Sequence, residues 1–243
     1  MVEGADTRQL HESVLDRLGF DIVSGAIPAA ARISSEEISE RFGVSRTVAR
    51  EVVRVLESLG LVSIRRRAGI TVLDQREWQA LDPKVIRWRL AGPERFAQLA
   101  WLAELRSGVE PLAARLAATN ATPDECGALT AAVVGMSATA RAANKAAYLG
   151  HDVDFHATLL AASGNPLLQV FAPIVREVLA GRTEHALMPE HADPVAVQLH
   201  IDVAAAIGAR DAAAAEAAMR EIVLESATAV ADLQTAVQPA TQR

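Results

Sequence analysis

The hydrophobic and polar positions of residues 33–72 first follow a helical period, which predicts two short helices joined by a tight turn. Gly43 stands between the helices, where the turn needs a residue that tolerates a positive φ. A serine that can cap a helix precedes each one, Ser34 or Ser35 before the first and Ser45 before the second. The apolar positions that hold the helical spacing are Ile38, Phe42, Val48, Val52, Val55, Leu56 and Leu59.

After Gly60 the period changes to alternation, which predicts two short strands around residues 61–64 and 70–72. The loop between the strands is basic and consists of Arg65, Arg66, Arg67, Ala68 and Gly69. The polar face of the second helix carries three more arginines, Arg46, Arg50 and Arg54. An arginine-bearing helix suits the major groove of DNA, and a basic wing tip can lie along a groove. A solvated helical face beside a basic hairpin is the alternative interpretation.

Helical spacing continues through the rest of the chain, and no strand pattern follows Val72. A helix over residues 7–24 precedes the region described above. The later helices are expected from residue 83, from 93 to 118, from 122, and over 145–162, 167–183, 195–209 and 211–233. We therefore predict a mainly α protein. A winged helix-turn-helix occupies residues 1–75, and an all-helical bundle of six to seven helices occupies residues 76–243.

Composition and charge narrow the classes of protein that fit this pattern. The 243 residues are 51% hydrophobic and carry a net charge of −6, yet residues 45–67 hold six arginines against two glutamates. A local basic surface on an acidic chain fits a regulator better than a general nucleic-acid coat. Cys126 is the single cysteine, so we expect no internal disulfide and a reducing compartment. The sequence shows neither a signal-peptide pattern nor a membrane-spanning apolar run, which predicts a cytoplasmic protein.

The bundle region contains several residues that bear chemistry. Asp152 and His156 are four residues apart on a helix, so they share a face and can bind one metal ion, with His200 as a third ligand. An ordinary Asp–His hydrogen bond explains the same spacing. Arg106 can pair with Glu110 on an amphipathic helix, or it can point into the bundle and need an anionic partner there.

The segments GVSRTVAREVVRVLESLGLV and RRRAGITV resemble the winged helix-turn-helix of the GntR family of bacterial transcription regulators. The resemblance implies that the chain binds a double-stranded DNA operator, with the wing entering the minor groove. The resemblance and the basic loop between the two strands together imply the following DNA contacts: Ser45, Arg46, Thr47, Arg50, Arg65, Arg66, Arg67 and Gly69. Many family members carry an arginine where this chain has Glu36, which removes one expected contact.

The segments LRSGVEPLAARLAA, DVDFHATLLAASGNPLL and LHIDVAAAIGARDAAAAEAAM resemble the FCD effector domain of the FadR subfamily. The resemblance implies that Arg106 binds an effector carboxylate and that a divalent metal, zinc first, is held by three ligands. Those ligands are Asp152, His156 and His200. Ile222 occupies the position of the usual fourth histidine. The segment EWQALDPKVIRWRL resembles the branch that responds to galactonate or related sugar acids.

The expected function is thus a homodimeric repressor that a small carboxylate, such as galactonate or gluconate, releases from DNA. Two alternatives stay open: a hydrolase with a catalytic metal on Asp152, His156 and His200, and a dimeric DNA-binding module that senses nothing. Arg176, Arg182 and His185 are further possible effector contacts, although solvated surface is the favoured interpretation for them.

Overall fold

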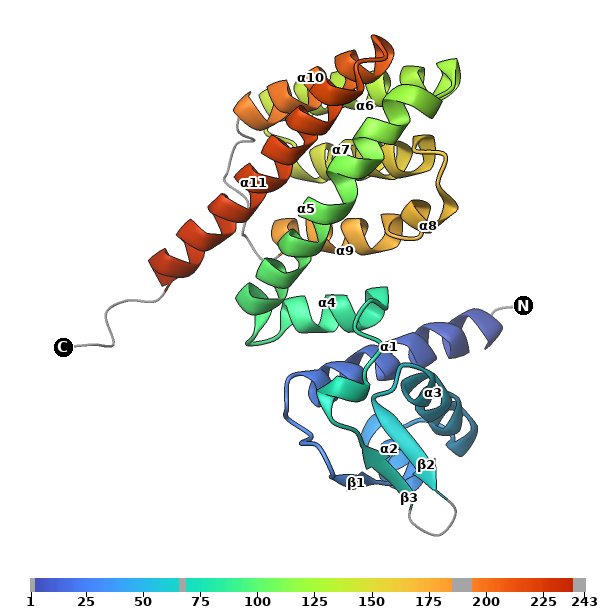
Figure 1. Cartoon of the computed structure of the whole chain (residues 1–243). Helices are drawn as coiled ribbons and strands as arrows, with labels where there is room; N and C mark the ends of the chain where they lie inside the picture. Colours follow the sequence, from blue (N-terminus) through green and yellow to red (C-terminus); the bar gives the residue numbers. More distant parts are fainter. Residues whose placement is uncertain (1–2, 66–68, 185–193, 238–243) are drawn as a thin grey trace, which may run out of the picture. The chain divides into compact units, whose positions relative to one another are not determined.

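The computed structural model describes residues 3–65, 69–184 and 194–237 (Figure 1). The chain divides into two compact units, residues 1–95 and 96–243. Each unit has a hydrophobic core of its own.

The first unit is a small helical domain with a three-stranded antiparallel sheet of order β1-β3-β2. Its first elements are α1 (Glu3–Val23), β1 (Arg32–Ile33), α2 (Ser35–Phe42), α3 (Arg46–Ser58), β2 (Val62–Arg65) and β3 (Gly69–Val72). The two strands expected from the alternation are present, and Val62 lies opposite Val72 in their register. The sequence pattern did not reveal β1, because two residues are too short to show a period.

The start of each short helix forms as the sequence predicts. Ser34 caps α2 in a reciprocal pair with Glu37: the Glu37 N–H donates to Ser34 Oγ at 3.1 Å, and the Ser34 N–H donates to the Glu37 carboxylate at 2.7 Å. Ser45 caps α3 by accepting the Val48 N–H at 3.3 Å. Gly43 ends α2 with a φ of 65°. These caps fix where α3 begins, and therefore which arginines lie in its first turns.

The core of this unit also includes α4 (Pro83–Ala91), which follows the 3-10 turn η1 (Gln75–Glu77). Trp88 of α4 is buried, and its indole N–H donates to Asp16 of α1 at 3.1 Å. A Cβ on Gly19 would lie 2.5 Å from the Trp88 ring, so the glycine is what lets α4 approach α1. The structural division at Arg95 therefore comes later than the boundary after residue 75 that the sequence predicts.

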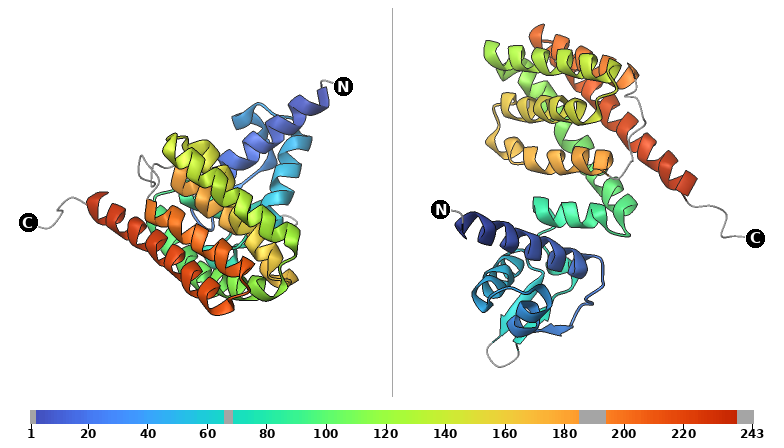
Figure 2. Two further views of the ribbon diagram at one scale, coloured as in Figure 1. Left: turned by 90° about the horizontal axis from the view of Figure 1, so that it is seen from above. Right: turned by 180° about the vertical axis from the view of Figure 1, so that it is seen from behind.

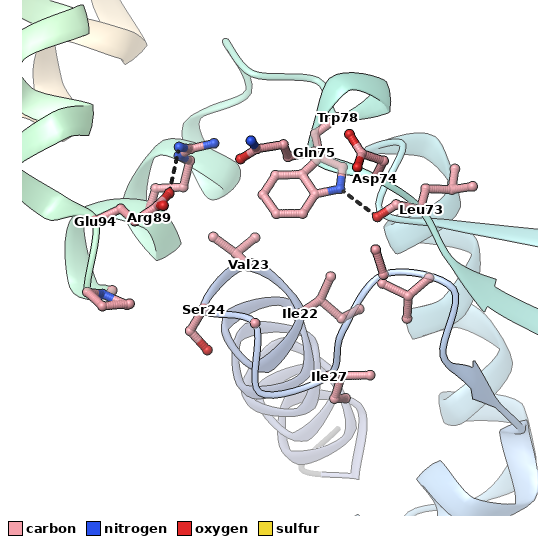
Figure 3. Close-up of a pocket in the computed structure, with 15 residues that line it drawn as sticks. Ile22, Val23, Ser24, Ile27, Leu73, Asp74, Gln75, Trp78, Arg89 and Glu94 are labelled. Carbon is pink, nitrogen blue, oxygen red and sulfur yellow. Dashed lines mark hydrogen bonds and ion pairs between the residues drawn. The ribbon is translucent and has the colours of Figure 1, made fainter.

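The connector after β3 runs beside a cavity of about 300 Å³ within the first unit (Figure 3). The Trp78 indole N–H donates to the Leu73 carbonyl at 3.3 Å, and the Arg89 guanidinium pairs with Glu94 at 3.3 Å. Trp78 is half-buried against the core, whereas Leu81 is 51% exposed. Trp78 rather than Leu81 thus attaches this connector to the unit.

The described part of the second unit is a bundle of seven α-helices without a strand, which confirms the all-helical prediction, although the helix expected over residues 167–183 is divided in two. The helices are α5 (Arg95–Asn120), α6 (Pro123–Arg141), α7 (Lys145–Ala162), α8 (Pro166–Gln169), α9 (Ala172–Glu184), α10 (Pro194–Gly208) and α11 (Ala212–Val237). Helix α7 lies between α6 and α9, and α5 crosses all three (Figures 1 and 2). One hydrophobic cluster packs α5, α6, α7, α10 and α11 together, and another packs α5, α7, α8 and α9. Because α5 and α7 contribute to both clusters, polar residues on their facing sides lie in the middle of the bundle.

Candidate functional site

The first two turns of α3 present a polar surface to solvent. Ser45, Arg46, Thr47 and Arg50 are all exposed, whereas Ala49, Val52, Val53 and Leu56 on the opposite side of the helix are buried. Arg46 forms an ion pair with Glu36 of α2. Arg50 makes no ion pair with any residue that the structure describes, so its guanidinium is available to an external partner.

The wing continues this surface on the next two strands. Arg65, at the end of β2, is exposed and lies opposite Gly69, which begins β3 with a φ of 79°. Arg66 and Arg67 lie outside the described residues. The described part of the wing therefore has the two strands that the sequence predicts, with one arginine beside the turn.

The second unit holds a buried cluster of five ionisable side chains from three helices. Arg106 and Glu110 come from α5, Asp152 and His156 from α7, and His200 from α10. Each of the five is at most 6% exposed. Charged groups are rarely buried to this degree without partners, because leaving water costs them several kcal/mol. The positions of the partners therefore decide what the cluster can do.

Three potential ligand atoms form a nearly equilateral triangle. Asp152 Oδ1 lies 3.4 Å from His156 Nε2 and 3.3 Å from His200 Nε2, and the two imidazole nitrogens are 3.4 Å apart. Zinc bound tetrahedrally at about 2.0–2.1 Å separates its ligand atoms by about 3.3–3.4 Å. The buried Asp152 Oδ1 has no well-aligned hydrogen bond within the described structure. The donor types, their separation and this unsatisfied oxygen all fit a divalent metal ion.

Both imidazoles have an oxygen beside their other nitrogen. His156 Nδ1 lies 2.8 Å from a Glu110 carboxylate oxygen, an ion-pair contact that is not aligned as a hydrogen bond, and His200 Nδ1 donates to the Ala196 carbonyl at 2.6 Å. A negative or carbonyl oxygen at Nδ1 favours the proton there and leaves Nε2 free to bind a metal. Both Nε2 atoms can therefore act as metal ligands without rearrangement.

Glu110 connects the triangle to Arg106. Its carboxylate accepts the Arg106 Nε–H at 2.5 Å and an Nη2–H at 3.2 Å while it also faces His156. Burial alone would raise the pKa of Glu110, but the charges of Arg106 and His156 lower it to about 2. Burial lowers the pKa of His156, but Glu110 and Asp152 more than offset this and raise it to about 9. Without a metal ion, His156 thus carries a proton at neutral pH.

The structure combines two interpretations of Arg106 that the sequence left as alternatives. The side chain points into the bundle and also pairs with Glu110. Sequence reasoning treated Glu110 only as that pairing partner and missed its contact with His156, because the two residues come from different helices. At the position of the usual fourth histidine, Ile222 supplies no ligand atom. Its side chain is 4% exposed and packs within an apolar cluster.

The two further arginines considered from the sequence differ in their surroundings. Arg176 of α9 is exposed, in agreement with the prediction that it lies on the solvated surface. The same prediction is wrong for Arg182, on the same helix, because that side chain is only 7% exposed. Its Nη1–H donates to Ser226 of α11 at 2.5 Å. His185 lies outside the described residues.

Two family models match the two units. The model described as "Bacterial regulatory proteins, gntR family" matches residues 10–72, and the FCD domain model matches residues 102–225. The chain belongs to the GntR family of regulators and carries an FCD domain. These are DNA-binding transcription regulators and not enzymes, which removes the hydrolase alternative.

Relatives of this GntR-family regulator cover nearly its whole length. The galactonate operon transcriptional repressor of Escherichia coli (strain K12) is 29% identical over 88% of this chain and 94% of its own. An HTH-type transcriptional regulator of Mycobacterium tuberculosis is 31% identical over 91% of this chain and 90% of its own. The solved structure of E. coli McbR/YncC covers 93% of this chain and 98% of its own with a TM-score of 0.54, and at 17% identity it supports the fold alone. No helix among the described residues is long and apolar enough to span a membrane.

Proposed function

We propose that this regulator is a homodimeric repressor that leaves its DNA operator when a small carboxylate binds beside the buried cluster of the FCD domain. The observation that carries the proposal is the triangle of Asp152, His156 and His200 next to Arg106. A buried site with a potential metal face and buried guanidinium groups suits a ligand that offers a carboxylate and hydroxyl oxygens. A sugar acid has both groups.

The relatives support the choice of acid. The name of the E. coli relative assigns it to a galactonate operon, and that protein aligns with both units of this chain. We therefore take galactonate as the first candidate and gluconate as the second. The residues that form the metal site in this proposal are Asp152, His156 and His200, with zinc as the ion, since two imidazoles and a carboxylate suit its coordination. When bound, zinc would supply an electrophilic position for an acid or hydroxyl oxygen.

The DNA contacts of the proposal come from α3 and the wing. Arg46 and Arg50 face the major groove, Ser45 and Thr47 contact the phosphate backbone, and the wing around Gly69 enters the minor groove, with Arg65 to Arg67 as its basic tip. Two copies are needed to read two half-sites one helical turn apart, which is the reason for a homodimer. Such a protein acts where bacterial DNA lies, in the cytoplasm.

The test uses the purified full chain in two steps. Selection from a random DNA library identifies the preferred site, and gel-shift titration at fixed salt then measures release by galactonate, gluconate and the neutral polyol galactitol. We expect a two-fold symmetric site and release by an acid but not by galactitol. Binding without sequence preference would contradict the assignment of α3. Specific binding that no acid affects would favour the module that senses nothing.

The metal part of the proposal has its own test. Elemental analysis of protein purified without chelator should find about one zinc per chain. Asp152→Asn should lower that content while leaving operator binding intact, because the DNA-binding residues belong to the other unit. Equal zinc content in the variant would contradict the assigned ligands.

A further inference from the structure

Arg182 of α9 is a buried cation with few partners among the described residues. Its side chain is 7% exposed, and its hydrogen bond to Ser226 uses one of five N–H donors. Its Nε has no hydrogen-bond partner in the described part of the chain. No ion pair joins Arg182 to a described residue, although a buried guanidinium normally needs an anion. Arg182 therefore has donors that a ligand can use.

Arg106, in contrast, already has its anion. Two of its nitrogens donate to Glu110, which places a carboxylate directly against the guanidinium. Asp152 likewise has cationic or metal-binding groups against it, since its Oδ1 lies 3.4 Å from His156 Nε2 and 3.3 Å from His200 Nε2. Both carboxylates of the cluster thus have partners within it, and neither of them pairs with Arg182.

Arg182 lies within electrostatic reach of the cluster. Burial lowers the pKa of its guanidinium first, and the positive charge of Arg106 lowers it further, while Glu225, Asp152 and Tyr148 act in the opposite direction. Glu225 is half-buried and forms no ion pair with Arg182. An anion placed against Arg182 would relieve both the cost of burial and the repulsion from Arg106.

We propose that Arg182 receives the carboxylate of the effector, and that Arg106 is a positioning residue that holds Glu110 against His156. This inference rests on the proposed function and specifies which guanidinium the acid meets. The planar fork of Arg182 can bind a carboxylate through two parallel N–H···O contacts. Hydroxyl oxygens of the same ligand would then face the Asp152–His156–His200 triangle. The ligand class is a small hydroxycarboxylate with one carboxylate.

The position of Arg182 also gives the ligand a structural effect. Arg182 belongs to α9 and its hydrogen-bond partner Ser226 belongs to α11, so an acid on this guanidinium sits at the contact between the two helices. Ligand binding that favours one arrangement of these helices shifts the population of bundle conformations.

The experiment compares Arg182→Met with Arg176→Met in the full-length protein. Both variants lose one arginine of α9, but Arg176 is exposed. Isothermal titration with galactonate should show affinity about tenfold to a hundredfold weaker for Arg182→Met and unchanged for Arg176→Met. Arg182→Lys keeps the charge and loses the fork, so its affinity should be intermediate. Galactonate affinity equal to wild type in Arg182→Met would overturn the inference.

Stability separates a ligand-receiving role from a structural one. Replacing an uncompensated buried cation by an apolar chain of similar length should leave the melting temperature without ligand unchanged or higher. If Arg182→Met does not fold, Arg182→Lys provides the affinity measurement, and galactonate affinity equal to wild type in that variant would overturn the inference. The proposed function itself would be overturned if the wild-type protein bound its operator but none of galactonate, gluconate, glycerate or lactate. If Arg182→Met bound the acid as well as wild type, only the role of Arg182 would be overturned.

Discussion

Without a metal ion on the Asp152–His156–His200 triangle, the stability of the regulator should depend on pH through His156. Its folded-state pKa is raised from 6.5 to about 9 by Glu110 and Asp152, against the opposing effect of burial. A group whose pKa is raised in the folded state contributes its full stabilisation at any pH below its unfolded-state pKa. That stabilisation is lost as the pH rises through its folded-state pKa. The carboxylate pKa values are lowered, so their contribution changes only in acid.

The size of the effect follows from the two pKa values. Each pH unit between 6.5 and about 9 corresponds to about 1.4 kcal/mol for one proton, which sums to about 3 kcal/mol. The free energy of unfolding of metal-free protein should therefore fall across this interval and level off above it. For a chain of this size the fall corresponds to about 6–12 °C in melting temperature.

The assay is urea unfolding of the full chain after dialysis against EDTA, followed by far-UV circular dichroism at a series of pH values. His156→Gln should remove the slope, and His11→Gln, in the other unit, should retain it. Zinc should also remove the slope and release about one proton per ion at neutral pH, because it replaces the proton on His156. The reasoning would be refuted if the free energy of unfolding of the metal-free protein stayed constant or rose from pH 6.5 to 9.

Three further predictions concern Glu36, Arg50 and a matched pair of glycines. Glu36→Gln should tighten operator binding about two- to fivefold in fluorescence anisotropy, since it releases Arg46 from an exposed ion pair; unchanged affinity would mean that the pair does not compete with DNA. Arg50→Ala should weaken specific binding by about 1–3 kcal/mol if Arg50 contacts a base, and an equal loss on random DNA would restrict it to phosphate. Gly60→Ala should destabilise the protein by about 2 kcal/mol or more, because φ is +73° and the new Cβ would lie 2.2 Å from a backbone oxygen. Gly108→Ala, in a helix with open space around it, should instead stabilise by about 0.5–1 kcal/mol, and similar losses in both variants would contradict this account.

Features that depend on neighbouring residues were predictable from the sequence. The caps at Ser34 and Ser45 and the turn at Gly43 involve contacts within a few residues, and all three form as expected. The shared face of Asp152 and His156 follows from helical spacing alone, and the structure places both in the buried cluster.

Features that depend on contacts between distant segments were not predictable in this way. The membership of α4 in the first unit depends on the fit of Trp88 over Gly19, which no local period reveals. The contact of Glu110 with His156 joins α5 to α7, so spacing showed only its pairing with Arg106. The burial of Arg182 involves a contact with Ser226 of the distant helix α11, whereas composition alone favours an exposed arginine.

Release of the operator by an acid requires coupling between the acid site and the DNA site. The decisive measurement is the affinity of the zinc-loaded full chain for galactonate, determined for the free protein and for its operator complex at one salt concentration. Linkage requires that the operator weaken acid binding by the same factor by which the acid weakens operator binding. We predict equal factors of about 5–150-fold, the usual range of such coupling. Equal affinity of the acid for the free and the operator-bound protein would contradict the account.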